Sequence, residues 1–291
     1  MTEREMSGPF LFHRTILAAE YADALLGVRP VDRTSGLFLA GPRGIGKTTF
    51  IQNDLLVELR KRGVVCTYAD LGANRQQDPA VLIADALVAT LRDLESGGRK
   101  AVRKSGLLKL GLGDRISFDL TRMVTPEGAT MTEMFLAIIA KSGKLTVLVV
   151  DEAQHSLTTE AGVNTMFALK SARDVLNGAP ADGGSVSGPR LLLVLTGSQR
   201  DKLANLVTRR SQPFYGGEVS DFPRLGRDFS DSYTAWLNDR PAADNQFNPD
   251  DVWMAFAIVG KRPELLRRVL EAAAFSEGKA ASLKEALKDD A

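Results

Sequence analysis

Residues 41–49 read Gly-Pro-Arg-Gly-Ile-Gly-Lys-Thr-Thr, and they are the most informative segment of the sequence about its fold. From Gly41 to Thr48 it matches G-x-x-x-x-G-K-[ST] at every defined position. Glycines let the backbone curl so that successive N–H groups point at phosphate oxygens, and a following helix directs its positive end to the same anion. A short apolar strand is expected at 36–40 and helical spacing follows at 48–62. The sequence therefore predicts a phosphate-binding loop in its required strand–loop–helix context.

Each part of this loop has a defined role in holding a nucleotide. Lys47 is expected to reach the β- and γ-phosphates, and Thr48 to bind Mg²⁺. The expected ligands are ATP and Mg²⁺. The predicted nucleotide-binding residues are Gly41, Pro42, Arg43, Gly44, Ile45, Gly46, Lys47, Thr48 and Thr49.

A nucleotide held in this way needs a carboxylate near the metal ion. Residues 145–150 form an uninterrupted apolar run that ends in Asp151 and Glu152, and such a run is typical of a strand covered on both faces. Asp151 is the expected second metal ligand, directly or through water, and Glu152 the expected general base that polarises the attacking water. The alternative interpretation is a helix-capping aspartate followed by a solvent-facing glutamate.

Strand and helix patterns alternate along most of the chain, which indicates an α/β core with a parallel sheet. After about Leu225 only helical patterns remain, which indicates a small all-α domain. The expected division is an N-terminal helical segment at 1–35, a P-loop core at 36–225 and a C-terminal helical lid at 226–291. Within the core, 98–122 is expected to be a basic insertion with a β-hairpin, because apolar residues alternate on both sides of Gly113 and Asp114.

Composition excludes several classes of protein. Lys and Arg total 37 and Asp and Glu 36, so no global field attracts nucleic acid or anionic membrane. Cys66 is the single cysteine, so no intrachain disulfide forms. The chain shows no signal peptide and no apolar run of membrane-spanning length. We therefore expect a cytoplasmic protein without membrane contact.

The motif GPRGIGKTT, followed by LVVDEAQ and a helical domain, resembles the AAA+ ATPases over about Gly36 to Gly278. Within that family the chain looks closest to the initiator-like and STAND-like groups, including archaeal-type ATPases and the ATPase regulators of transposons. The segments LLLVLTGSQRDKL, RRSQPFYGG and GKRPELLRR carry this closer resemblance. It implies ATP binding between core and lid and assembly into a homo-oligomer.

The resemblance also implies roles for single residues. Thr196 is preferred as sensor 1, with Ser198 as the alternative. Arg209 and Arg210 lie where an arginine finger is expected, or are two solvated arginines. Arg262 resembles sensor 2, with Arg267 as the alternative. A departure is Gly216-Gly217 after the aromatic pair Phe214-Tyr215, where related proteins often carry Gly-Arg.

Two features bear on ligands and partners. His13, with Phe12 and Arg14, precedes the first strand, where AAA+ proteins often form the base pocket, so it either contacts adenine or packs on the N-terminal helix. A basic cluster leads into the expected hairpin and either contacts nucleic-acid phosphates or is a solvated surface. Its members are Arg99, Lys100, Arg103, Lys104 and Lys109.

The resulting functional hypothesis is an ATP-hydrolysing switch that regulates transposition or a related DNA transaction, with double-stranded DNA and an unidentified protein as partners. The alternative is a STAND-like signalling or defence switch that acts on proteins without DNA. A small-molecule kinase is a third hypothesis, which the Asp-Glu pair disfavours because that pair suits water activation.

Overall fold

The computed structural model describes residues 10–28, 36–105, 130–178, 190–239 and 246–274. The chain forms two compact units. The sheet unit comprises Ala19–Ala40 and Leu55–Asp221, and the P-loop unit comprises Met1–Ala18, Gly41–Asp54 and Phe222–Ala291. The division expected from the sequence, at 36–225 and 226–291, stays a prediction.

A five-stranded sheet forms the centre of the sheet unit, with strand order β2-β3-β4-β1-β5 and parallel pairing throughout. β1, β3 and β4 are buried along their whole length, which explains why their sequences are continuous apolar runs. All strands end at the same edge, as parallel strands must. The strands are β1 (Leu37–Ala40), β2 (Val65–Asp70), β3 (Thr146–Asp151), β4 (Leu191–Gly197) and β5 (Val219–Asp221).

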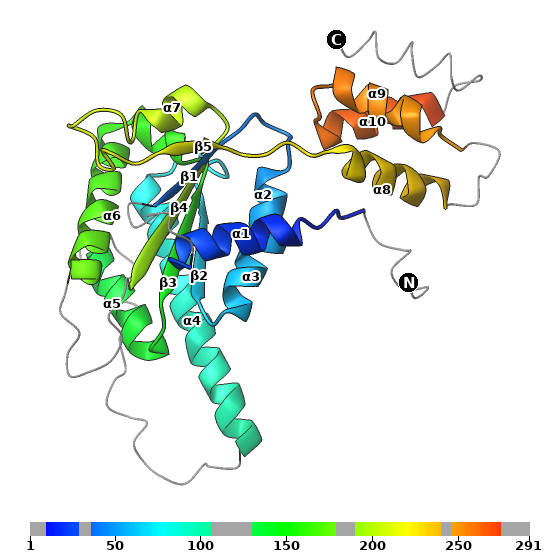
Figure 1. The fold of residues 1–291 in the computed structure, drawn as a ribbon. Coiled ribbons are helices and arrows are strands. Elements are labelled where there is room, and N and C mark those ends of the chain that lie inside the picture. Colours follow the sequence, from blue (N-terminus) through cyan, green and yellow to red (C-terminus); the bar gives the residue numbers. More distant parts are fainter. Residues whose placement is uncertain (1–9, 29–35, 106–129, 179–189, 240–245, 275–291) are drawn as a thin grey trace. The chain divides into compact units, whose positions relative to one another are not determined.

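Helices cover this sheet on both sides (Figure 1). α4, α5 and α6 pack against one another and against β2, β3 and β4, and their apolar faces join the strands in one core. On the opposite side, Arg62 after α3 binds Asp23 in α1 at 2.5 Å. The helices are α1 (Thr15–Leu25), α3 (Leu56–Lys61), α4 (Pro79–Ser105), α5 (Met131–Ser142), α6 (Glu160–Gly178) and α7 (Arg200–Ala204).

The beginning of α5 shows how local sequence sets a helix end. Thr130 Oγ1 accepts a hydrogen bond from the Glu133 amide at 3.3 Å, and the Glu133 carboxylate accepts one from the Thr130 amide at 2.7 Å. This reciprocal capping box, predicted from Thr-x-x-Glu, satisfies amides that have no partner within the helix.

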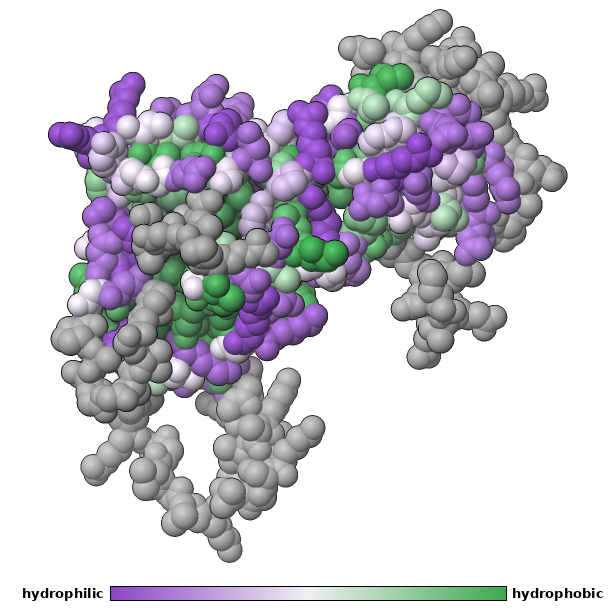
Figure 2. Space-filling view, in the orientation of Figure 1, coloured by the Kyte–Doolittle hydropathy of each residue, from purple (hydrophilic) through white to green (hydrophobic). Residues whose placement is uncertain are grey.

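The P-loop unit is helical. Rings of α8 and the N-terminal segment pack with aliphatic residues of α9 and α10 in a separate core. Hydrophilic residues dominate the visible side of this helical region (Figure 2), as expected for helices that bury one face. Its helices are α2 (Lys47–Phe50), a π-helical turn at Ile51–Leu55 shared with the sheet unit, α8 (Arg227–Asn238), α9 (Pro249–Ile258) and α10 (Pro263–Ala274).

Three details differ from expectation. β5 and α7 carry too few residues for a periodic pattern, so the sequence did not indicate them. α4 continues to Ser105, into the stretch 98–122 for which the sequence predicts a basic insertion with a β-hairpin; two glycines cost a helix only about 1 kcal/mol each, and the residues around them favour helix. The predicted hairpin at 108–120 lies outside the described residues.

Candidate functional site

The phosphate loop starts where β1 ends and is built on glycine conformations. Gly44 has φ 78° and Gly46 φ 90°, backbone angles that L side chains adopt at a cost. Gly41 is needed for a different reason, since a Cβ there would lie 2.5 Å from Cδ1 of Ile45. The three glycines therefore allow the tight curl that the motif predicts.

The lysine of the loop is buried and folded over its own backbone. Lys47 is 5% exposed and begins α2 directly after Gly46. Its Nζ donates to the carbonyl oxygen of Gly41 at 2.5 Å and to that of Pro42 at 3.3 Å. A cation is thus held beside a helix N-terminus, where backbone amides also favour an anion.

The other predicted loop residues lie mainly at the surface. Pro42, Arg43, Gly44, Thr48 and Thr49 are exposed, Gly46 is partly exposed, and Gly41 and Ile45 are buried. Thr48 and Thr49, at the start of α2, are thus among the solvent-exposed residues of the loop.

A cavity of about 570 Å³ adjoins the loop within the P-loop unit. Gly44, Gly46 and Thr49 form its phosphate-loop side, and aromatic rings form much of the rest. Such a combination suits a ligand with an anionic end and a flat apolar end. The aromatic lining residues are Phe10, Phe12, Phe50, Phe229, Tyr233 and Trp236.

The two arginines considered for sensor 2 both belong to this region. A Cβ atom added at Gly44 would lie 3.9 Å from Cδ of Arg262, so the two residues are close neighbours. The Nε of Arg262 donates a hydrogen bond to the carbonyl oxygen of Val259 at 3.2 Å. Arg267 lines the cavity and pairs with Glu271 at 2.9 Å. Glu264, which the sequence did not single out, also reaches the loop, with Oε2 4.0 Å from the Cβ position of Gly44.

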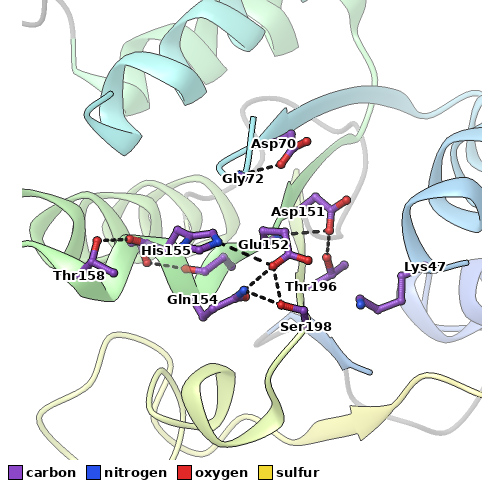
Figure 3. A network of polar contacts seen from close by, with 12 residues as sticks. Lys47, Asp70, Gly72, Asp151, Glu152, Gln154, His155, Thr158, Thr196 and Ser198 are labelled. Atoms are coloured by element: carbon purple, nitrogen blue, oxygen red, sulfur yellow. Dashed lines mark hydrogen bonds and ion pairs between the residues drawn. The ribbon is translucent and has the colours of Figure 1, made fainter. Parts of the chain in front are cut away.

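The acidic part of the predicted site lies in the sheet unit (Figure 3). Asp151, at the end of β3, is 1% exposed. Its Oδ1 accepts hydrogen bonds from the Thr196 hydroxyl and, at 3.0 Å, from the Glu152 amide. Its Oδ2 accepts one from the Tyr68 hydroxyl at 2.9 Å. The buried carboxylate is therefore fixed from both neighbouring strands.

Glu152 is held by a second set of polar groups. Its backbone has φ 54°, and its side chain is 14% exposed. Oε2 accepts hydrogen bonds from Ser198 Oγ at 2.8 Å and from Gln154 Nε2, and His155 Nε2 lies 3.9 Å away (Figure 3). Gly72 faces this carboxylate closely, because a Cβ there would lie 3.2 Å from Glu152 Cγ.

The structure brings both sensor 1 candidates to the acids. Thr196 binds Asp151 and Ser198 binds Glu152. Arg209 and Arg210 are exposed in the segment after α7, and the network of Figure 3 does not include them. Sequence reasoning missed Tyr68 and Gln154; Tyr68 is one of several alternating polar positions in β2, and nothing local marks it.

Oxygen ligands of the kind that Mg²⁺ takes occur in each unit. Mg²⁺ is typically bound through one or two protein oxygens together with phosphate oxygens and water. In the sheet unit Asp151 is a carboxylate fixed by hydrogen bonds, and in the P-loop unit Thr48 is an exposed threonine. No group of three or more His, Cys, Asp or Glu side chains suited to a metal occurs within the described ranges.

Comparisons with known proteins agree on the fold. No protein-family model and no curated protein matches the chain. Solved structures do match. The Walker-type ATPase of Pyrococcus abyssi has 18% identity and a TM-score of 0.62, over 96% of this chain and 72% of that one. The ORC2 protein of Aeropyrum pernix, in ADPNP and ADP complexes, has 14% identity and a TM-score of 0.56, over 98% and 70%.

A third similar structure is the ORC1 protein of Aeropyrum pernix in complex with DNA. It has 16% identity and a TM-score of 0.54, over 97% of this chain and 66% of that one. The chain thus shares the fold of these ATPase and ORC structures, a parallel α/β core with a helical domain, and the predicted fold class is confirmed. In the part of the chain that the structure describes, no helix is long and apolar enough to cross a membrane.

Proposed function

We propose that this chain binds Mg-ATP at residues 41–49 and hydrolyses it. The observation that carries the proposal is the loop itself, in which Gly44 and Gly46 adopt positive φ and buried Lys47 starts the helix. This arrangement concentrates amide donors and one cation at a single point, which favours a polyphosphate. A cavity with aromatic walls next to the loop leaves room for the nucleoside.

The residues of the loop and the acid pair divide the chemistry. Lys47 would neutralise phosphate charge, and Thr48 and Asp151 would hold Mg²⁺, which would supply charge stabilisation to the transferred phosphoryl group. Thr196 orients Asp151 through its hydrogen bond. Glu152 accepts the proton of the attacking water, because a carboxylate held by donors on one oxygen keeps the other available as a base.

The proposal also assigns arginine side chains to the nucleotide phosphates. Arg262 contacts the ATP phosphates from the helical region, since its side chain already lies against Gly44. Arg209 or Arg210 reaches the nucleotide of a neighbouring copy, because an exposed arginine outside the acid network is available to another subunit. ATP binding then favours a homo-oligomer, and hydrolysis releases it.

The proposed biological role is regulation of a DNA transaction of the transposition or mobile-element type, in the cytoplasm. Support comes from similar structures that were solved with DNA, the ORC1 protein of Aeropyrum pernix and the ORC of Drosophila. A partner protein and double-stranded DNA are the proposed ligands of the assembled form.

Steady-state ATP hydrolysis and nucleotide affinity of the purified full chain test the ATPase proposal. Lys47→Ala should weaken ATP binding at least about a hundredfold, because charge-assisted contacts to phosphate are lost. Lys61→Ala, an exposed lysine of the same helical segment, is the matched control. Wild-type affinity in Lys47→Ala would overturn the proposal.

Glu152→Gln separates binding from chemistry. It should retain ATP affinity and lower turnover by about 10²–10⁴, the range for loss of a general base. Glu160→Gln, an exposed carboxylate at the start of α6, should change neither. Normal turnover in Glu152→Gln would refute the assignment of the base.

The DNA role needs a separate readout. Turnover and particle size are measured with and without double-stranded DNA at two salt concentrations, with a slowly hydrolysed ATP analogue for sizing. Stimulation that falls as salt rises supports DNA contact. Assemblies that ignore DNA would refute the DNA role and favour a switch acting on proteins.

A further inference from the structure

Asp54 is a buried carboxylate that the proposed phosphate chemistry does not use. Its side chain is 3% exposed, and it lies in the π-helical turn Ile51–Leu55 that follows α2. Burying an ionised carboxylate is unfavourable unless it is paired and hydrogen-bonded. Single π-helical turns are frequent at functional sites. The partners of Asp54 therefore indicate its role.

The Asp54 carboxylate contacts the N-terminal segment Phe10–Arg14, about forty residues earlier in the chain, through both of its oxygens. Nδ1 of His13 lies 2.7 Å from Oδ1 of Asp54, and the Arg14 amide donates to Oδ2 at 3.1 Å. The Arg14 guanidinium donates to the Pro223 carbonyl at 2.7 Å and lies 5.0 Å from the ring centroid of Phe222. One end of the segment is thus fixed to the helix of the phosphate loop.

The other end of the segment packs on rings of α8. Phe10 lies 4.9 Å from the ring of Tyr233 and 5.6 Å from that of Trp236, between centroids. Phe12 meets Phe229 edge-on at 5.6 Å. Phe10, Leu11, Phe12 and Arg14 line the same cavity as the phosphate loop. The segment therefore forms one wall of that cavity, and Asp54 determines where the wall stands.

We propose that Asp54 is a positioning residue that holds the segment Phe10–Arg14 as the nucleobase-facing wall of the nucleotide cavity. This inference rests on the proposed nucleotide binding. A flat base gains dispersion and stacking energy from aromatic rings only where the rings are held in place. The phosphate donors are the loop amides and Lys47, and their geometry is set by the glycines of the loop. Asp54 therefore acts on affinity for the nucleoside part and leaves affinity for the polyphosphate part unchanged.

Calorimetric titration of the full chain with Mg-ATP and with Mg-tripolyphosphate separates these two contributions. In Asp54→Ala the affinity for ATP should fall about tenfold, by loss of an ordered stacking surface, while the affinity for tripolyphosphate stays at the wild-type value. Gln52→Ala, an exposed residue of the same helical segment, is the control and should change neither. Equal losses for both ligands, or no loss for ATP, would overturn the inference.

A second variant, His13→Ala, tests the same inference in case Asp54→Ala fails to fold. His13 has a side chain that is 54% exposed, so His13→Ala removes one contact of Asp54 with little loss of packing. It should lower ATP affinity severalfold without affecting tripolyphosphate, at an unchanged melting temperature. Unchanged ATP affinity in this folded variant would count against the proposed wall.

The wild-type titrations separate this inference from the proposed function. Wild-type protein that binds tripolyphosphate as tightly as ATP would refute the base-facing wall and leave the phosphate loop in place. Wild-type protein that binds neither ligand would refute the proposed function, and the inference with it.

Discussion

Ser198 Oγ donates a hydrogen bond of 2.8 Å to Oε2 of Glu152. Gln154 donates to the same oxygen, and its Nε2 also lies 3.1 Å from Ser198 Oγ. Two neutral donors thus share one carboxylate oxygen, while Gly72 closes off the side chain at its Cγ. The orientation of the proposed general base is set by these three residues.

Ser198→Ala tests this orientation. Loss of one donor should lower kcat about tenfold with little change in KM, because Glu152 then samples unproductive positions. Ser211→Ala, at an exposed position, is the control. An unchanged kcat would show that Ser198 does not act on Glu152.

Thr196→Val tests the contribution of the Asp151 network to stability. Valine preserves the shape but removes a donor to a buried carboxylate, so the free energy of unfolding should fall by about 1–3 kcal/mol. Thr165→Val is the comparison, because the buried Thr165 hydroxyl donates to the helix carbonyl of Ala161 at 2.9 Å. Thr165→Val should lower the free energy of unfolding by less than Thr196→Val does. Denaturant unfolding of both variants measures the difference, and equal losses would contradict the prediction.

Arg262→Ala and Arg267→Ala distinguish the two sensor 2 candidates. Arg262 lies against Gly44 of the phosphate loop, whereas Arg267 is paired with Glu271. Arg262→Ala should therefore lower ATP affinity about tenfold relative to ADP, through loss of a charge-assisted contact. Arg267→Ala should leave the ATP-to-ADP ratio unchanged. The opposite pattern would transfer the role to Arg267.

The thiol of Cys66 predicts a pH dependence of stability. Burial raises the pKa of Cys66 to about 11, above the value of about 8.5 for an unfolded chain. Between these values the unfolded chain has lost the proton that the folded chain retains, so the free energy of unfolding falls as pH rises from about 8.5 to about 11. Well below about pH 8.5 both states keep the proton, and the thiol contributes no slope. Unfolding of wild type and Cys66→Ala across this range should diverge by about 1.4 kcal/mol per pH unit; parallel curves would contradict it.

The buried strands and the strand-end acids could be predicted because both depend on local pattern. Asp151 and Thr196 follow apolar runs, and neighbouring parallel strands bring such ends together. Tyr68 and Asp54 could not be predicted in the same way. Tyr68 binds a residue 83 positions away, and Asp54 binds one 41 positions away, so their roles depend on tertiary contacts that no local spacing encodes.

The two candidate arginines for sensor 2 also differ through tertiary contacts that local sequence does not encode. The resemblance favours Arg262, just before α10, as sensor 2 and keeps Arg267, within α10, as the alternative. The different surroundings of the two side chains are visible only in the folded chain, where one approaches Gly44 and the other pairs with Glu271 along the helix surface. Short elements such as β5 and α7 were missed because three or five residues show no period.

The π-helical turn at Ile51–Leu55 has a consequence for the evolution of this helix. Each residue of a regular helix advances about 100° around its axis. A π-helical turn takes up about one residue more than a regular turn, so deleting one residue within Ile51–Leu55 would restore regular winding and keep the side chains before and after the turn on nearly the same faces. A homologue without the turn must therefore align to this chain with a one-residue gap just after the phosphate loop.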